Sequence, residues 1–231
     1  MRLFYDPNIA INAQSHTLSE EESKHIVRVL RMTEGDRLIL LNGRGGEFVC
    51  EITDAHPKKC VVQINEQTQA TPPPYSIHIA VSPTKQLERI EWFVEKATEI
   101  GITEITFLTC TNSERVKLKL DRLERKAISA MKQSHRKFLP KLNDLVTASS
   151  FIQNNPEGLI AHCYEGEKTL LTESFTPKTC PILIGPEGDF SKAEVELAAK
   201  NGYKLITLGD NRLRTETAAL YACMQAKLIV G

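Results

Sequence analysis

Three consecutive prolines at positions 72–74 divide the sequence into two parts with different patterns. A proline ring fixes φ and removes an N–H donor, so this segment is extended and no helix runs through it. We therefore expect two domains, residues 1–70 and 76–231, joined by a linker at 71–75. A chain of 231 residues is long enough for two domains that each bury a core.

The part before the prolines is predicted to be a small β-barrel. Short runs of β-branched and apolar residues indicate strands at 37–41, 47–53 and 60–64. The glycine-rich segment 42–46 between the first two runs is a hairpin signal. One helix is expected to begin at Ser19, which would form a capping box with Glu22. The apolar side of this helix would comprise Ile26, Val27, Val29 and Leu30.

The part after the prolines alternates between strands and helices. Apolar runs indicate strands at 76–81, 105–110, 159–163, 181–184 and 204–208. Helices are expected at 87–100 and at 120–136, and Gly101 would end the first of them. A further helix is expected after each of the last two strands. This alternation predicts an α/β domain with a parallel sheet that helices cover on both faces.

Composition argues against several classes of protein. The 29 basic and 29 acidic residues give no net charge, whereas a protein that binds nucleic acid by bulk charge has a basic excess. The six cysteines contain no CxxC pair, so we expect reduced thiols and no metal site. Residues 1–7 do not fit a signal peptide, and no apolar run reaches the ~20 residues of a membrane span. We therefore predict a cytoplasmic protein.

Positive charge is nevertheless concentrated in one segment. Between Arg115 and Lys141 there are ten lysines and arginines against two acids. Such a stripe suits contact with a phosphate backbone, and the alternative is a solvated helix face. Together with Lys24, Arg28 and Arg31 on the first helix, the stripe predicts a basic surface on both domains.

Two loops in the second part carry the strongest functional signals, because ligands of parallel sheets bind where strands end. The strand at 181–184 is followed by a Gly-Pro-Glu-Gly segment. Its glycines expose backbone N–H and C=O groups that suit the edge of a flat heterocycle. The alternative is a plain strand-to-helix turn without a ligand. The segment 209–218 places two Arg, one Glu and two Thr at the start of a helix, which is more than a helix cap requires. No GxGxxG or Walker pattern occurs.

These motifs resemble the RsmE family, which methylates N3 of one uridine in small-subunit ribosomal RNA. The resemblance rests on the runs Ile-Gly-Pro-Glu-Gly at 184–188 and Leu-Arg-Thr-Glu-Thr-Ala at 213–218. Residues 25–36 look like the N-terminal RNA-binding domain of that family, which is PUA-like. Residues 85–101, 113–115 and 133–136 resemble further motifs of its second domain. Asp189 and Lys132 stand where the family often has Gly and Glu.

The resemblance implies a PUA-like β-barrel followed by a SPOUT α/β domain with a parallel sheet and a trefoil knot, in a homodimer. It implies S-adenosylmethionine as cofactor and 16S rRNA, free or in the assembled small ribosomal subunit, as substrate. His162 and Cys163 would line the cofactor pocket. The cofactor-binding residues that it implies are Ile184, Gly185, Pro186, Glu187, Gly188, Leu208, Gly209, Leu213, Arg214, Glu216 and Thr217.

Methyl transfer to N3 is an in-line displacement, so the uridine has to be unpaired or flipped out for its N3 to lie opposite the sulfur. We expect Arg136 and Arg214 to stabilise the negative charge that develops at the uracil carbonyls. The alternatives are a phosphate contact for either residue, or a salt bridge between Arg214 and Glu216. RNA contacts are expected from Lys24, Arg28, Arg31, Lys85, Arg89, Arg115 and Lys117.

Two other functions stay open on sequence grounds. One is a SPOUT methyltransferase that acts on tRNA or 23S rRNA, and the other is an RNA-binding assembly factor without catalysis. The intact 213–218 motif argues against the second. Neither the general base nor the particular uridine can be named from the residues alone.

Overall fold

The computed structural model describes residues 1–177 and 180–231, which form two compact units. The first unit contains residues 1–72 together with 131–139, and the second contains residues 73–130 together with 140–231. The chain first leaves the N-terminal unit between Pro72 and Pro73, inside irregular backbone. Residues 131–139 belong to the first unit again, and residues 140–231 then complete the second unit.

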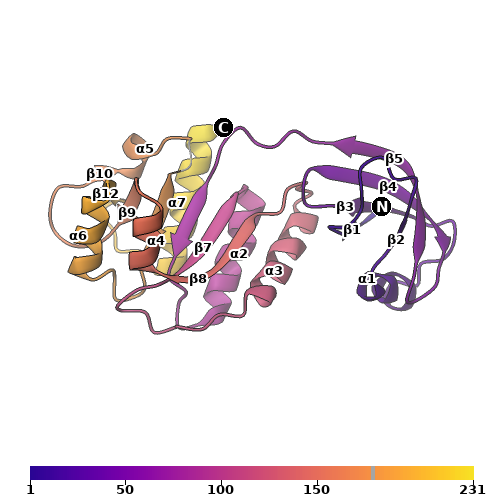
Figure 1. The fold of residues 1–231 in the computed structure, drawn as a ribbon, viewed down its shortest axis with the longest axis horizontal. Coiled ribbons are helices and arrows are strands. Elements are labelled where there is room, and N and C mark those ends of the chain that lie inside the picture. Colours follow the sequence, from indigo (N-terminus) through magenta and orange to yellow (C-terminus); the bar gives the residue numbers. More distant parts are fainter. Residues whose placement is uncertain (178–179) are drawn as a thin grey trace. The chain divides into compact units, whose positions relative to one another are not determined.

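The first unit is built on a five-stranded sheet with the order β1-β3-β4-β5-β2 (Figure 1). Neighbouring strands are antiparallel except β1 and β3, which run parallel. The side chains of Phe4, Leu38, Phe48 and Val62 lie in its buried core. The strands are β1 (Arg2–Tyr5), β2 (Ser15–Thr17), β3 (Arg37–Leu41), β4 (Gly46–Asp54) and β5 (Val61–Gln69).

The predicted hairpin between β3 and β4 is confirmed. Asn42 organises its loop, because the side-chain oxygen of Asn42 accepts hydrogen bonds from the N–H groups of Arg44 and Gly46, each at 2.8 Å. Gly43 and Gly45 adopt φ values of 71° and 94°, which a residue with a Cβ rarely tolerates.

The helix expected from Ser19 is α1 (Glu20–Lys24), and it continues into a π-helical turn η1 (His25–Val29). The Ser19 hydroxyl accepts a hydrogen bond from the Glu22 N–H at 3.3 Å, as a helix cap does. The prediction of the apolar side was wrong for Val29, which is 66% exposed, whereas Ile26 is buried. A π-helical turn contains an extra residue, and this rotates Val29 away from the core.

The segment 131–139 completes the first unit. Its backbone pairs with the β3–β4 loop, since the Gly45 N–H donates to the Lys137 carbonyl at 2.8 Å and the Leu139 N–H donates to the Gly43 carbonyl at 2.9 Å. A Cβ at Gly45 would lie 2.7 Å from the ring of Phe138, so only glycine fits there. The last turn of helix α3 (Leu120–Gln133) belongs to this segment.

The second unit contains a seven-stranded sheet with the order β10-β12-β9-β11-β6-β7-β8, in which every neighbouring pair is parallel. This confirms the predicted α/β class. The strands are β6 (His78–Val81), β7 (Glu104–Thr109), β8 (Lys141–Thr147), β9 (Gly158–Ala161), β10 (Thr169–Leu170), β11 (Pro181–Ile184) and β12 (Tyr203–Thr207). The remaining helices are α2 (Leu87–Ile100), α4 (Ala148–Asn154), α5 (Leu171–Ser174), α6 (Lys192–Lys200) and α7 (Thr215–Val230).

Helices cover both faces of this sheet (Figure 1). Ala80 and Leu183 point toward one face, where they pack with residues of α4 and α6. Alternate strand residues point the other way, so the buried Ile79 and Ile182 face the opposite side. There α7 lies against β6 and β11 and packs on α2. Because the strands are parallel, all their C-terminal ends lie along one edge of the sheet.

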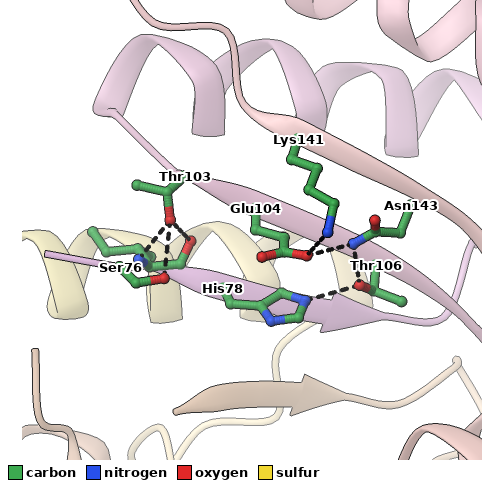
Figure 2. Close-up of polar contacts among 8 residues, drawn as sticks. Ser76, His78, Thr103, Glu104, Thr106, Lys141 and Asn143 are labelled. Atoms are coloured by element: carbon green, nitrogen blue, oxygen red, sulfur yellow. Dashed lines mark hydrogen bonds and ion pairs between the residues drawn. The ribbon is translucent and has the colours of Figure 1, made fainter. Parts of the chain in front are cut away.

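A polar network crosses the opposite edge, where the strands begin (Figure 2). The His78 ring nitrogen Nε2 lies 2.8 Å from the Thr106 hydroxyl. The Asn143 amide donates to that hydroxyl at 2.8 Å and to Glu104 at 2.7 Å, and Lys141 donates to Glu104 at 2.9 Å. These side chains come from the adjacent strands β6, β7 and β8, so the network joins the three strands at their N-terminal ends.

Candidate functional site

A cavity of about 700 Å³ opens in the second unit at the C-terminal ends of β9, β11 and β12. Three strand ends and the loops that follow them form its walls: residues 161–163 at the end of β9, residues 184–187 with 189 at the end of β11, and residues 206–215 from the end of β12 to the start of α7. Lys168 and Ala218 complete the lining. The volume falls within the range of sites that bind small molecules and cofactors.

Most of the residues that the sequence assigned to the cofactor come together here. Those that line the cavity are Ile184, Gly185, Pro186, Glu187, Leu208, Gly209, Leu213 and Arg214. His162 and Cys163, expected at the same pocket, also line it. Gly188, Glu216 and Thr217 are not among the lining residues.

The loop after β11 is held in place by its neighbours. The Thr215 hydroxyl donates to the Gly185 carbonyl at 3.1 Å, which links this loop to the start of α7. The Glu187 carboxylate accepts a hydrogen bond from the Lys85 N–H at 3.1 Å, which links it to the loop after β6. A Cβ at Gly185 would lie 3.0 Å from both the ring and the backbone nitrogen of Phe190, so a side chain there would push the loop open.

The loop after β12 depends on Gly209, whose φ of +121° is rarely accessible to other residues. A Cβ at this position would project into open space, with no heavy atom within 4 Å. Glycine therefore both permits the turn and leaves room beside the cavity. Helix α7 begins where this loop ends. On the preceding helix, α6, Ser191 and Glu194 make both hydrogen bonds of a capping box.

His162 and Lys168 place polar groups in the cavity wall that follows β9. Both ring nitrogens of His162 are buried and make no hydrogen bond within the described parts of the chain. Burial lowers the pKa of His162, and the nearby ammonium of Lys168 lowers it further. The Lys168 ammonium donates to the carbonyls of His162 at 3.3 Å and Tyr164 at 2.7 Å. The wall thus contains a neutral imidazole beside a cation.

Glu216 forms an ion pair with Arg89, not with Arg214. The Arg89 Nη1 and Glu216 Oε1 atoms lie 3.4 Å apart, and the Glu216 side chain is only 10% exposed. Arg214 is exposed, lines the cavity, and its side chain makes no hydrogen bond or ion pair with residues 1–177 or 180–231. Arg89, which was predicted to contact RNA, therefore joins α2 to the start of α7.

The other predicted RNA contacts divide between the two units. Lys24, Arg28 and Arg31 are exposed in the first unit, to which Arg136 also belongs. In the second unit Lys117 is exposed and Lys85 pairs with Glu114 at 2.9 Å. The Arg115 guanidinium donates to the Thr84 carbonyl at 3.0 Å and to the Lys85 carbonyl, so it supports the loop after β6.

Part of the basic segment 115–141 is engaged within the protein. Arg122 and Lys126 on α3 face Glu91 on α2, whose side chain is 7% exposed. Lys137 pairs with Glu47 at 3.2 Å and Lys141 pairs with Glu104 at 2.9 Å. The sequence pattern could not separate these structural cations from the exposed ones, because it does not show which helix face meets a buried acid.

Residues 1–177 and 180–231 contain no candidate metal centre and no candidate membrane-spanning helix. No group of three or more His, Cys, Asp or Glu side chains is arranged to hold a metal ion. No helix in this part of the chain combines the length and the apolar character that crossing a membrane requires.

Two known protein families match this chain, one in each of its two parts. The family model of the RNA methyltransferase domain matches residues 71–227, and that of the RNA methyltransferase PUA domain matches residues 18–65. The two units and the strand-end cavity therefore define an RNA methyltransferase with an N-terminal PUA domain, which confirms the predicted combination of a PUA-like domain and an α/β methyltransferase domain. Over 99% of its length, the chain is 30% identical to ribosomal RNA small subunit methyltransferase E of Rickettsia conorii, of which it covers 95%. The chain belongs to the ribosomal RNA small subunit methyltransferase E family.

Solved structures agree with this membership. A Porphyromonas gingivalis protein named as a probable rRNA-methyltransferase is 42% identical, with a TM-score of 0.89 over 99% of this chain and 98% of its own. Ribosomal RNA small subunit methyltransferase E from Neisseria gonorrhoeae, bound to S-adenosyl methionine, is 25% identical, with a TM-score of 0.83 over 96% of this chain and 95% of its own.

Proposed function

We propose that this protein transfers the methyl group of S-adenosylmethionine to N3 of a specific uridine in 16S rRNA, as a step of rRNA processing in ribosome biogenesis. The observation that carries the proposal is the cavity, which gathers eight of the eleven predicted cofactor residues from two separate loops. The names of the relatives support it, because they are small-subunit ribosomal RNA methyltransferases and one of them is bound to S-adenosyl methionine.

The cavity suits S-adenosylmethionine in size and chemistry. Ile184, Leu208 and Leu213 provide apolar surface for a flat adenine ring, and Gly209 leaves space for close approach of the ligand to the backbone. The buried ring nitrogens of His162 have no hydrogen-bond partner among residues 1–177 and 180–231, so this wall can offer hydrogen bonds to a ligand. When bound, the cofactor supplies a methyl group on a positively charged sulfur. Gly188, Glu216 and Thr217 would then act from behind the cavity wall.

Arg214 and Arg136 are the residues that we assign to the reacting base. Arg214 is exposed at the cavity, and its guanidinium has no partner in the described part of the chain, so its charge is available to the carbonyl oxygens of a uracil that enters there. The negative charge on those oxygens grows as N3 loses its proton, and a fixed positive charge stabilises it. Arg136 would supply a second cation from the segment 131–139.

The substrate is proposed to be 16S rRNA, free or in the assembled small subunit. The exposed Lys24, Arg28 and Arg31 of the PUA unit and Lys117 of the second unit provide cations for phosphates. A chain with no net charge would bind with moderate, salt-sensitive affinity and derive its specificity from the shape of the RNA. We place this activity in the cytoplasm.

We also propose that the protein acts as a homodimer and that the loops around the cavity form the trefoil knot of SPOUT domains. Helix α7 supports the dimer, because Tyr221, Met224 and Leu228 are 41%, 45% and 82% exposed and follow one another at helical spacing. An exposed apolar stripe on a helix is typical of a surface that another protein covers. A second copy of the chain is the occupant that we propose.

Mass spectrometry of nucleosides tests the proposed function. Small-subunit RNA from a strain without the gene should lack one 3-methyluridine, and incubation with the purified protein and S-adenosylmethionine should restore it. Unchanged 3-methyluridine in the deletion strain would contradict the proposal, and a methylated nucleoside lost from tRNA or 23S rRNA instead would favour the other substrates. Calorimetry separates the non-catalytic alternative, which predicts no binding of S-adenosylmethionine.

A further inference from the structure

Asp189 stands in the loop after β11 with a φ of +64° and lines the cavity. Residues other than glycine are uncommon in this left-handed region, and they persist there when the surroundings hold them. An acidic residue in a strained conformation at a cavity wall therefore needs a compensating contact.

The Asp189 carboxylate makes two short hydrogen bonds that account for this conformation. Its Oδ1 atom accepts from the N–H of the next residue, Phe190, at 2.7 Å. Its Oδ2 atom accepts from the N–H of Cys163 at 2.7 Å, across to the loop that follows β9. Hydrogen bonds to an ionised carboxylate are among the stronger ones in proteins. Glycine at this position would keep the backbone conformation but lose both bonds.

The backbone around Asp189 is fixed from the other side. The Asn112 amide, in the loop after β7, donates to the carbonyls of Gly188 and Asp189, each at 3.1 Å. The Asp189 N–H donates to the Pro186 carbonyl at 2.9 Å. The residue is therefore anchored through its main chain, and its carboxylate links this anchored backbone to the 162–163 wall.

Strands β9 and β11 pair directly as far as Ala161 and Ile184, and beyond that point the described chain has two hydrogen bonds between the wall and the segment after β11. In the described chain, the second hydrogen bond between these loops runs from the Tyr164 hydroxyl to the Phe190 carbonyl, at 2.7 Å. His162 and Cys163 both line the cavity, so their distance from Gly185 and Pro186 determines its width.

We propose that Asp189 is a positioning residue: its carboxylate ties the 162–163 wall to the loop after β11 and thereby sets the width of the cofactor cavity. The proposal rests on the proposed function, since it takes the ligand of the cavity to be S-adenosylmethionine. Asp189 holds the wall through the Cys163 N–H and makes no contact with the reacting atoms.

The test compares Asp189→Gly and Asp189→Asn with the wild type and a matched control. Glu157→Gly is the control, because Glu157 is also an acidic residue with positive φ, at 67°, and lies outside the cavity lining. Calorimetry measures the dissociation constant of S-adenosylmethionine. Hydrogen–deuterium exchange of peptides that span 160–166 measures the wall without any ligand.

We expect Asp189→Gly to speed amide exchange at 162–164. It should weaken S-adenosylmethionine binding about tenfold, because the ligand would then have to order the wall that the Asp189 carboxylate no longer holds. For Asp189→Asn, both the amide exchange at 162–164 and the dissociation constant should lie between those of the wild type and Asp189→Gly. The amide oxygen of Asn can still accept one of the two hydrogen bonds, and Asn tolerates positive φ. Glu157→Gly should match the wild type in both measurements. Unchanged exchange in the β11 peptide would show that the Asp189 variants remain folded.

Two outcomes would overturn different statements. Binding by Asp189→Gly within twofold of the wild type, with unchanged exchange at 162–164, would overturn the role of Asp189 and leave the proposed function standing. A wild-type protein that binds no S-adenosylmethionine would overturn the proposed function itself.

Discussion

Arg89 on α2 and Glu216 at the start of α7 form an ion pair in which Nη1 and Oε1 lie 3.4 Å apart. The Glu216 side chain is 10% exposed, so this carboxylate has little access to water when its partner is removed. The pair fixes the first turn of α7, which directly follows the cavity loop at 206–215.

Arg89→Ala should therefore destabilise the second unit by about 1–2 kcal/mol, between the values for an exposed pair and a fully buried one. Urea unfolding can be followed through Trp92, the single tryptophan, which lies in α2. Lys85→Ala is the control, because Lys85 and Glu114 pair with side chains 73% and 52% exposed. Its cost should stay below about 0.5 kcal/mol. Equal costs for the two variants would contradict the structural role of Arg89.

The polar network at the start of β6, β7 and β8 should make stability depend on pH. Burial lowers the pKa of His78 below its ordinary 6.5; Glu104 opposes this shift and Lys141 adds to it. The unfolded chain thus binds a proton more readily than the folded one, and stability should fall as pH drops below 6.5. The pKa of Glu104 lies below its ordinary 4.5, so its own contribution is retained above that pH.

Unfolding midpoints at pH 7.5 and 5.5, followed through Trp92, check this expectation. The wild type should lose stability between the two values, and His78→Asn should lose less. His135→Asn serves as the control, since His135 is exposed and its positive φ of 55° suits Asn. The same loss in His78→Asn and wild type would assign the pH effect to other groups.

Arg136→Ala and Arg214→Ala should each slow methylation about 100-fold, the effect of removing one group that stabilises a developing oxyanion. The measurement is single-turnover methylation of small-subunit RNA, with circular dichroism to verify folding. Arg214→Lys should recover part of the rate because it keeps the charge. Lys200→Ala, an exposed cation at the end of α6, is the control. Wild-type rates in both alanine variants, folded and dimeric, would refute the assignment.

Binding of RNA should weaken with salt, and the exposed cations of α1 and η1 should contribute to that dependence. If Lys24 and Arg28 each neutralise one phosphate, replacing either by Ala lowers the slope of log K against log salt by about one. Filter binding across a salt series measures the slope. Lys58→Ala, an exposed cation in the turn before β5, should leave the slope unchanged. An unaltered slope in the first two variants would remove this helix from the RNA surface.

Leu228→Glu should dissociate the proposed homodimer, because it places a charge in the middle of an apolar contact. Analytical ultracentrifugation of this variant should give a mass near 25.9 kDa, the mass of one chain, and the wild type twice that. Lys227→Glu tests whether charge alone has the effect, since Lys227 is the neighbouring residue on α7. A monomeric wild type would contradict the proposal directly.

Local signals in the sequence predicted the elements that surround the cavity. Helix α2 has the predicted bounds, and Gly101 ends it with a φ of 107°, because amphipathic spacing and a left-handed glycine are both local properties. Strand β11 was predicted for the same reason. The cavity residues followed, since loops after parallel strands meet at one edge.

Other features depend on contacts between distant residues and left no such signal. Strand β8 was not predicted, because it is an edge strand with a polar sequence and half-buried side chains. The short strands β1 and β2 were missed as well. The ion pair between Glu216 and Arg89 was not predicted either, because the two residues lie 127 positions apart, a distance that no spacing rule covers.

The nine residues at 131–139 make the PUA unit a discontinuous module. A fragment that stops at the prolines would lack Lys137 and Leu139, whose backbone groups pair with Gly45 and Gly43. Exchange of the RNA-binding module between such enzymes therefore requires two pieces of chain, residues 1–72 and 131–139. A circular permutant that joins 131–139 to residue 1 would be the smallest contiguous form of this module.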